Sequence, residues 1–327
     1  MRDFSYHRAA SAEEARREAG AAGALLLAGG TTLLDLAKCG VAEPDKLVDI
    51  THLKGLDAIR VTAEGAVIGA LAKMSRVAED AGIKAEYPAV SEALWQAASA
   101  QIRNMASMGG NLMQRTRCAY FRDPASFPAC NKRNPGSGCS AMGGVNRSHA
   151  VLGVSESCIA TYPGDLAVAL VAFDAEVHLG ERRIAVEDFF LLPGDTPDRE
   201  HAIEPGELIT AISIPASPAA RRSTYLKIRD RQSYEFAAAS AAVGLELEAD
   251  GKTIRDLRVA LGGVATKPWR ARAVEDALRG KVLEPQAVKR ASLLAVEGAV
   301  DHGANHYKID LVPRVVARAI QKLGESA

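Results

Sequence analysis

Four of the five cysteines of this 327-residue chain fall in one short window. Cys118, Cys130, Cys139 and Cys158 lie within 41 consecutive residues, and Cys39 stands alone. Thiolates gathered in this way are the ligands that soft transition metals and iron–sulfur clusters prefer. The window therefore predicts a metal or cluster site, whereas Cys39 is expected to be a buried structural thiol.

The spacing of the four cysteines, C-x11-C-x8-C-x18-C, narrows the kind of site. Structural zinc sites usually contain C-x2-C pairs, and the window has none. It also lacks the cysteine runs of bacterial and plant-type ferredoxins. Disulfides are poorly motivated, because a chain of this length does not need covalent cross-links. Four thiolates from separate turns suit a [4Fe-4S] cluster gripped by a long loop, with zinc as the alternative.

Basic side chains crowd the same window, which we take as residues 114–158. They are Arg115, Arg117, Arg122, Lys132, Arg133 and Arg147. Nearby cations stabilise an anionic cluster and raise its reduction potential. Without the cysteines, such a basic segment would favour a surface for nucleic acid or a partner protein. The window has little apolar periodicity, and a long irregular loop inside a domain is usually functional.

Two glycine-containing loops elsewhere have the composition of phosphate-binding turns. Residues 25–34 join an apolar strand to a helix through Gly29 and Gly30, and residues 102–112 contain a second pair of glycines. Glycine lets the backbone approach a phosphate closely, and a helix N-terminus offers free N–H groups. Neither loop matches the Rossmann or Walker pattern. Two such loops without a P-loop lysine fit a dinucleotide better than a nucleoside triphosphate, and ordinary turns are the alternative.

The overall composition excludes several classes of protein. Forty basic and forty acidic side chains cancel, so no net field favours nucleic acid or an anionic membrane. The apolar stretches are too short for a membrane span. The first residues turn polar at once and lack the apolar core of a secretion signal. We expect a chain without a signal of its own, which stays in the cytoplasm or reaches the periplasm by export with a signal-bearing partner.

The chain length predicts two to three domains. Alternating apolar and polar segments predict a small strand–helix–strand unit that ends near residue 50. A mixed region follows, with a helix over 165–173. After a linker near 215–222, the pattern predicts a sheet backed by helices.

Four motifs occur in an order and spacing that is specific in combination. They are the strand-Gly-Gly-Thr loop, the Arg-Asn-x-Ala-Ser-x-Gly-Gly-Asn segment, Pro-Gly-Asp-Leu at 163–166, and Tyr-Leu-Lys-x-Arg-x-Arg at 225–231. Together they resemble the flavoprotein (medium) subunit of the xanthine dehydrogenase and carbon monoxide dehydrogenase family. The resemblance implies an α+β fold, in which a two-subdomain FAD-binding region of the vanillyl-alcohol-oxidase (PCMH) type precedes a C-terminal α+β flavoprotein domain. The implied domains are residues 1–52, residues 53–216 with the cluster-binding insert 114–158, and residues 223–327.

The same resemblance implies a set of FAD contacts. They are Leu27, Ala28, Gly29, Gly30, Thr31, Thr32, Leu33 and Leu34 around the diphosphate, Ser107, Gly110 and Asn111 completing that cradle, Asp165 at the ribityl or ribose hydroxyls, and Ile212 and Lys227 near the flavin. Two of these residues also have simpler interpretations. Asp165 would serve as a helix cap, and Lys227 would be a solvated side chain at a strand edge. Beside a flavin, a fixed positive charge would stabilise the anionic reduced ring.

The cysteine-containing insert indicates which members of this family the chain resembles most. It looks like the FAD subunit of bacterial periplasmic aldehyde oxidoreductases, and less closely like the flavoprotein subunit of 4-hydroxybenzoyl-CoA reductase. The resemblance implies a heterotrimer in which electrons pass from a large molybdenum subunit through a small [2Fe-2S] subunit to FAD here, and then to an external acceptor. The alternatives are a subunit of another molybdenum hydroxylase, such as a xanthine-dehydrogenase-like one, a stand-alone flavin oxidase, or a zinc-stabilised scaffold.

Overall fold

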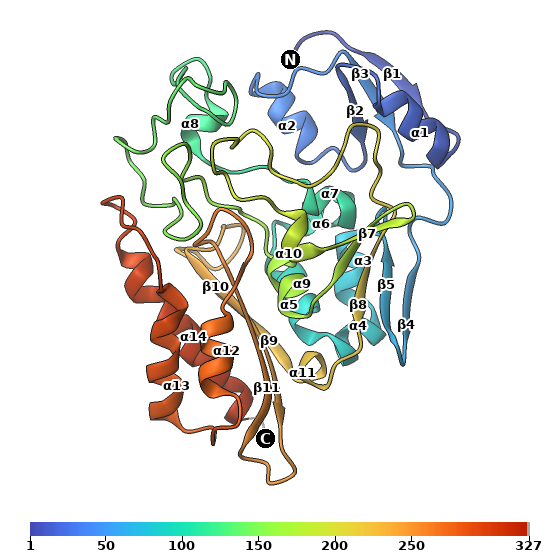
Figure 1. The fold of residues 1–327 in the computed structure, drawn as a ribbon. Helices are drawn as coiled ribbons and strands as arrows, with labels where there is room; N and C mark the ends of the chain where they lie inside the picture. Colours follow the sequence, from blue (N-terminus) through green and yellow to red (C-terminus); the bar gives the residue numbers. More distant parts are fainter. Residues whose placement is uncertain (326–327) are drawn as a thin grey trace.

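The computed structural model describes residues 1–325, whose strands form three separate sheets (Figure 1). The N-terminal elements are β1 (Ser5–Arg8), α1 (Ala12–Ala19), β2 (Ala24–Leu27), α2 (Leu33–Lys38) and β3 (Lys46–Asp49). The first sheet is parallel, with β3 between β1 and β2. Since the carboxyl ends of parallel strands lie at one edge of the sheet, the turns after β2 and β3 come out on the same side.

The second sheet is antiparallel and has the order β4-β5-β8-β6-β7. Its strands are β4 (Ile59–Thr62), β5 (Gly65–Gly69), β6 (Glu176–Leu179), β7 (Arg182–Ala185) and β8 (Ala211–Pro215), and its helices are α3 (Met74–Glu79), α4 (Ala81–Glu86), α5 (Pro88–Gln96), α6 (Ala100–Met105), α7 (Met108–Leu112), α9 (Leu166–Ala172) and α10 (Val186–Phe189). All seven residues of α9 are buried, as expected for a helix that is apolar on every side. This helix packs against α5 and also against the third sheet.

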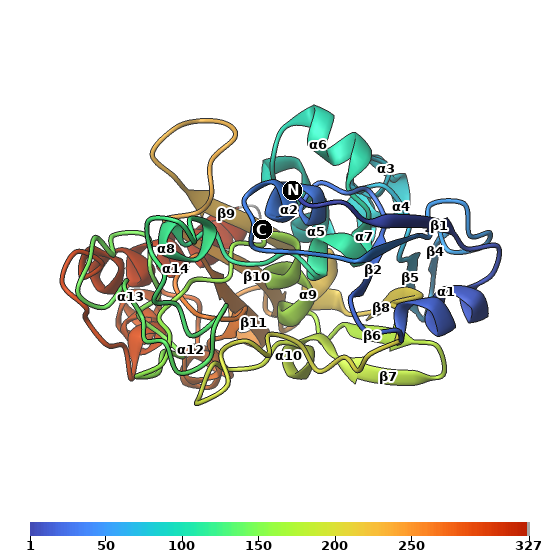
Figure 2. The same cartoon turned by 90° about the horizontal axis from the view of Figure 1, so that it is seen from above.

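The third sheet is antiparallel and is covered by C-terminal helices (Figure 1). Its strands are β9 (Ser223–Ile228), β10 (Ala239–Leu247), β11 (Ile254–Gly262) and β12 (Trp269–Arg270), and the helices are α11 (Pro218–Arg221), α12 (Arg272–Leu278), α13 (Pro285–Ser292), the 3-10 turn η1 (Leu293–Val296) and α14 (Tyr307–Glu325). The loop between β9 and β10 stands clear of the rest of the molecule (Figure 2). Within residues 1–325, no helix combines the length and apolar character needed to cross a membrane.

The insert 114–158 is irregular apart from the short helix α8 (Ala119–Arg122). Arg117 donates a hydrogen bond to Asp35 of α2 at 3.1 Å, and Arg122 donates to the same carboxylate. At the other end, Asn146 donates to the carbonyl of His302 at 2.6 Å. The insert is therefore attached to both the N-terminal and the C-terminal parts of the chain, and these attachments hold a loop that has few regular backbone hydrogen bonds.

The α+β fold class expected from the sequence is confirmed. The predicted C-terminal sheet backed by helices is present, and within it helix α13 ends at Ser292 and continues as the turn η1. Cys39 was expected to be buried and is partly exposed. It follows the end of α2, where one side faces solvent.

Candidate cofactor sites

The two glycine-containing loops meet in space. A Cβ atom built on Gly29 would lie 2.2 Å from the carbonyl oxygen of Met105, so only glycine permits this approach. Ala28 and Gly29 of the first loop and Ser107 of the second line one cleft of about 510 Å³. That volume lies in the range of small-molecule and cofactor sites. The structure therefore provides a cleft at the point where the sequence predicts a diphosphate.

Local hydrogen bonds explain the shape of both loops. Gly30 has a φ of 70°, in the left-handed region that favours glycine, and its carbonyl accepts the N–H of Leu34 at 3.1 Å as α2 begins. Ser107 is the N-cap of α7 and accepts the N–H of Gly110 at 3.3 Å. Each loop thus leads into a helix, and each turn is set by a residue that the sequence analysis singled out.

A buried acceptor in the second loop has no partner. The Asn111 side chain donates from Nδ2 to the sulfur of Met74 at 3.4 Å, but its Oδ1 atom is buried without a hydrogen bond. An unsatisfied buried oxygen of this kind calls for a donor from a ligand or a water molecule. Asn111 therefore fits the role of a polar contact to a cofactor.

The cleft also contains residues that the sequence analysis did not identify. They are Thr51, His52, Leu53, Lys54, Gly55, Asp57, Leu71, Lys73 and Arg76. Lys73 donates to the carbonyl of Met105 at 2.9 Å, which places a cation at the junction of the two loops. Basic groups suit the charge of a diphosphate. No local sequence motif marks these residues. They reach the cleft because β2 and β3 pair in parallel, which brings the turn after β3 to the same edge of the sheet as Gly29.

Asp165 and Lys227 lie away from this cleft and pair with each other. Lys227 donates to Asp165 at 2.8 Å, and Tyr225 donates to the other carboxylate oxygen at 2.6 Å. Burial raises the pKa of Asp165, and Lys227 and Tyr225 oppose that shift. The Asp165 side chain makes no hydrogen bond that caps α9, and only 1% of the Lys227 side chain is exposed. The helix-cap and solvated-edge interpretations are therefore wrong.

The predicted contacts of the remaining residues with FAD stay predictions. Ile212 is fully buried on β8, in the middle of the second sheet. Leu27 ends β2, Thr31 and Thr32 belong to the turn, and the pair Leu33–Leu34 opens α2. The structure thus places the first-loop residues beside the cleft and places Asp165, Ile212 and Lys227 in the interior.

The four cysteines of the insert line one common cavity. Cys130 and Cys139 lie opposite each other in an antiparallel bridge, and Cys118 and Cys158 complete the wall. Cys39 is not among the residues around this cavity. His149 is buried, and its Nε2 atom lies 3.2 Å from the sulfur of Cys118. Burial lowers the pKa of His149 to about 4, so the ring is neutral near pH 7.

The four cysteines are not grouped as ligands of a single metal ion. No group of three or more His, Cys, Asp or Glu side chains within residues 1–325 is arranged to hold one metal ion. Sulfurs around one tetrahedral zinc lie roughly 3.8 Å apart, given Zn–S bonds of about 2.3 Å. In a cluster each thiolate binds a different iron, so the sulfurs stand further apart. The cavity that the four cysteines line has a volume of about 10 Å³, and thiolates are the ligands that hold iron–sulfur clusters.

Burial keeps two of the four thiols, Cys118 and Cys158, protonated near pH 7. Burial raises the pKa of Cys118 to about 11, although backbone N–H groups oppose the shift. Burial also raises the pKa of Cys158, against the opposing charge of Lys132. Because thiolates are the form that binds metal, occupation of the cavity must displace these protons.

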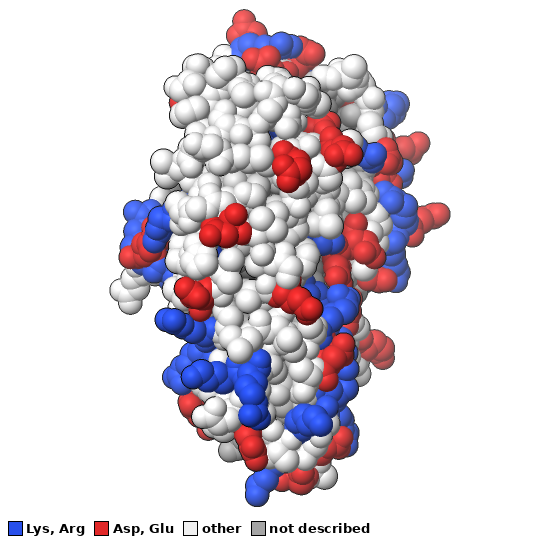
Figure 3. Space-filling model, turned by 60° about the vertical axis from the view of Figure 1, so that its left-hand side comes forward, with Lys and Arg blue, Asp and Glu red and all other residues white. Residues whose placement is uncertain are grey.

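Several basic side chains of the insert make contacts within the protein, whereas Arg147 is exposed. Arg133 donates to the carbonyls of Tyr120 at 3.1 Å and Phe121 at 3.0 Å, and the Lys132 side chain is 9% exposed. In Figure 3, which brings the left side of Figure 1 forward, the upper part of the surface, where the insert lies, is mostly uncharged. Arg133 therefore braces the loop through backbone carbonyls, and Lys132 is the basic residue of the insert that lines the cysteine cavity.

Comparison with known families decides the identity of this fold and these loops. Residues 2–217 match the FAD binding domain in molybdopterin dehydrogenase, and residues 224–323 match the CO dehydrogenase flavoprotein C-terminal domain. This chain is an FAD-binding medium subunit of the molybdenum hydroxylase family. As such it is a subunit of an oxidoreductase, and the cleft between its two glycine loops lies in the FAD-binding domain.

Individual relatives of this medium subunit agree with that assignment. The aldehyde oxidoreductase FAD-binding subunit PaoB of Escherichia coli is 46% identical over 84% of this chain and 86% of its own length. The glyceraldehyde dehydrogenase medium chain of Sulfolobus acidocaldarius is 28% identical over 98% of both chains. A solved CO dehydrogenase from Oligotropha carboxidovorans has a TM-score of 0.76 at 24% identity over 100% of this chain and 99% of that one, which supports the fold.

Proposed function

We propose that this medium subunit carries FAD and one [4Fe-4S] cluster and transfers electrons within a molybdenum-dependent aldehyde oxidoreductase. The observation that carries the proposal is the convergence of Cys118, Cys130, Cys139 and Cys158 on one cavity in a chain that has the FAD-binding domain. The similarity to the aldehyde oxidoreductase subunit of Escherichia coli supports the substrate class.

In this proposal the chain works with a large molybdenum subunit and a small [2Fe-2S] subunit in a heterotrimer. Electrons enter from the [2Fe-2S] centres and leave from the flavin to an external acceptor. The chain's own residues bind and orient the cofactors: Gly29 and Ser107 hold the diphosphate, Asn111 offers Oδ1 to a cofactor donor, and Lys73 faces the phosphate charge. FAD, when bound, supplies the step between two-electron and one-electron chemistry.

The domain division 1–52, 53–216 and 223–327 belongs to the same proposal. Three separate sheets, each with its own hydrophobic core, support it. The insert 114–158 has a small core of its own around Phe121, next to the cysteine cavity. A segment with its own core and cofactor ligands is best understood as a cofactor-binding addition to the second domain.

The experiment is replacement of single cysteines in the native complex, followed by iron and FAD analysis. Cys118→Ser, Cys130→Ser, Cys139→Ser and Cys158→Ser are each expected to lose iron. Cys39→Ser is the matched control, because Cys39 lies outside the cavity, and its iron content is expected to equal that of the wild type. FAD is expected to remain in all five variants, since the FAD cleft is formed by other residues. Because the [2Fe-2S] centres of the small subunit add iron to every sample, iron content equal to wild type in all four cavity variants would refute the cluster.

A further inference from the structure

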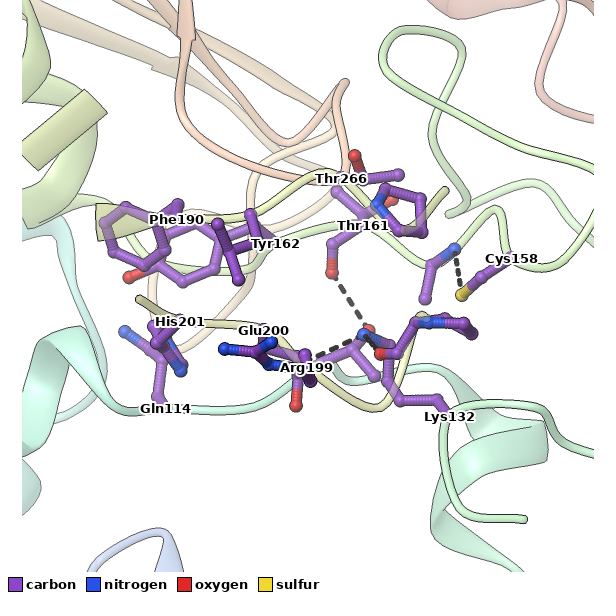
Figure 4. Close-up of a pocket in the computed structure, with 15 residues that line it drawn as sticks. Gln114, Lys132, Cys158, Thr161, Tyr162, Phe190, Arg199, Glu200, His201 and Thr266 are labelled. Atoms are coloured by element: carbon purple, nitrogen blue, oxygen red, sulfur yellow. Dashed lines mark hydrogen bonds and ion pairs between the residues drawn. The ribbon is translucent and has the colours of Figure 1, made fainter. Parts of the chain in front are cut away.

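A second small cavity lies beside Cys158 and is bordered by charged side chains that the cofactor contacts above do not use. Lys132, Cys158, Tyr162 and Glu200 are among its lining residues (Figure 4). Its volume of about 20 Å³ leaves room for about one water molecule. Charges beside so small a space are weakly screened, because bulk water cannot enter. Lys132 and Cys158 line this cavity and the cysteine cavity alike, so Lys132 stands between the two.

Lys132 is held in place by acceptors from a distant loop. Its Nζ atom donates to the carbonyl of Pro197 at 2.9 Å and pairs with Oε1 of Glu200 at 3.0 Å (Figure 4). Arg115 pairs with the other oxygen of Glu200 and lies over the ring of Phe121 at 4.6 Å from its centroid. Two cations thus share one carboxylate.

The net charge of this group is positive. Burial alone would raise the pKa of Glu200, but Lys132 and Arg115 outweigh burial and lower it, so Glu200 is ionised. One carboxylate against two cations leaves an excess of one positive charge beside Cys158. Simple stabilisation of the loop would not call for this excess, because a buried charge costs free energy unless it is fully paired. The Arg115 side chain is 27% exposed and is partly solvated, whereas Lys132 is 9% exposed, so an anion in the cysteine cavity would act chiefly on Lys132.

We propose that Lys132 sets the reduction potential of the cluster through the Cys158 ligand, and that Glu200 and Arg115 position Lys132. The inference rests on the proposed function, since it requires the cluster. One-electron reduction adds one negative charge at the thiolate site, and a fixed buried cation stabilises that charge. Glu200 acts in the opposite sense, because its own negative charge offsets part of the field of Lys132.

The test is a redox titration of the native complex, followed by EPR of the reduced cluster, in the variants Lys132→Met and Glu200→Gln. Lys132→Met is expected to disfavour reduction at least tenfold, a fall of about 59 mV in the midpoint potential for one electron. Glu200→Gln is expected to raise the midpoint potential. Opposite signs would not arise from a structural role, since loosening of the loop would affect both variants alike.

Arg270→Met is the control variant. Arg270 is a buried cation paired with Glu275, it lines neither cavity, and its loss is expected to leave the potential unchanged. Unchanged potentials in Lys132→Met and Glu200→Gln, with iron retained, would overturn the inference and leave the proposed function intact. If the Lys132→Met variant loses its iron, the midpoint potential of the Glu200→Gln variant tests the inference. A raised potential supports the inference, and an unchanged potential overturns it. Equal iron content in the wild type and the Cys158→Ser variant would instead refute the proposed function, and the inference with it.

Discussion

The contact between the two glycine loops makes the affinity for FAD sensitive to a single methyl group. In Gly29→Ala the new Cβ would lie 2.2 Å from the carbonyl oxygen of Met105 and 2.9 Å from its carbonyl carbon. An ordinary carbon–oxygen contact is roughly 3.3 Å, so the loops must separate by about 1 Å. Both neighbouring atoms belong to the backbone, which means that no side-chain rotation can relieve the contact.

The magnitude follows from the cost of overpacking, which is about 1–3 kcal/mol. If this free energy is lost from FAD binding, the dissociation constant for FAD rises by about 5- to 150-fold, since 1.4 kcal/mol corresponds to a factor of ten. The assay is fluorescence titration of FAD into the flavin-depleted complex. Gly143→Ala is the matched control, because a Cβ there would meet no atom within 4 Å. Wild-type affinity in a folded Gly29→Ala complex would refute the view that the junction of these loops forms the diphosphate site.

Three further predictions concern charged side chains. Asp165→Asn leaves the ammonium group of Lys227 buried without its carboxylate, so it is expected to lower the unfolding free energy by about 3–5 kcal/mol in denaturant titrations. A loss below 1 kcal/mol would contradict a buried pair. Burial lowers the pKa of Lys308 to about 7, below its unfolded value near 10.5. Between these two pH values the unfolded state binds more protons than the folded state. The contribution of this lysine to stability therefore rises from pH 7 to pH 10.5. Lys308→Met is expected to flatten the pH dependence of the melting temperature in that window, and an unchanged slope would argue against it. Asp35→Asn weakens the attachment of Arg117 to α2 and is expected to speed limited proteolysis within the insert, whereas equal cleavage rates would show that the attachment does not order the loop.

The parts of the fold that follow from local sequence are those with a clear apolar pattern. The predicted strand at 24–28 is β2, and the predicted helix over 165–173 is α9, both rich in buried apolar residues. Strand β1 was missed because three of its four residues are exposed and it pairs on one side only, so it has no apolar alternation. Strand β8 was missed because it is short and runs directly into the Pro215 segment, which was assigned to a linker.

The candidate sites also combine features that the sequence predicts with features that only the tertiary structure reveals. The types and spacing of four cysteines pointed to one common site, and the structure brings them to one cavity. The pairing of Lys132 with Glu200 and of Lys227 with Asp165 lay beyond sequence reasoning, because each pair joins segments that only the tertiary fold brings together. The inward contact of Arg133 with the carbonyls of Tyr120 and Phe121 was equally hidden, since residue type gives the charge of a side chain and does not reveal its direction.

The most direct test of this account is quantitative iron, zinc and FAD analysis of the anaerobically purified native complex, with low-temperature EPR of the reduced Cys158→Ser variant beside the wild type. The [2Fe-2S] centres of the small subunit contribute their own iron, so the difference between the two samples isolates the cluster of this chain. The account predicts one FAD per medium subunit and a loss of about four irons, together with one EPR signal, in the variant. Equal iron content in the two samples, or stoichiometric zinc in the wild type, would contradict it.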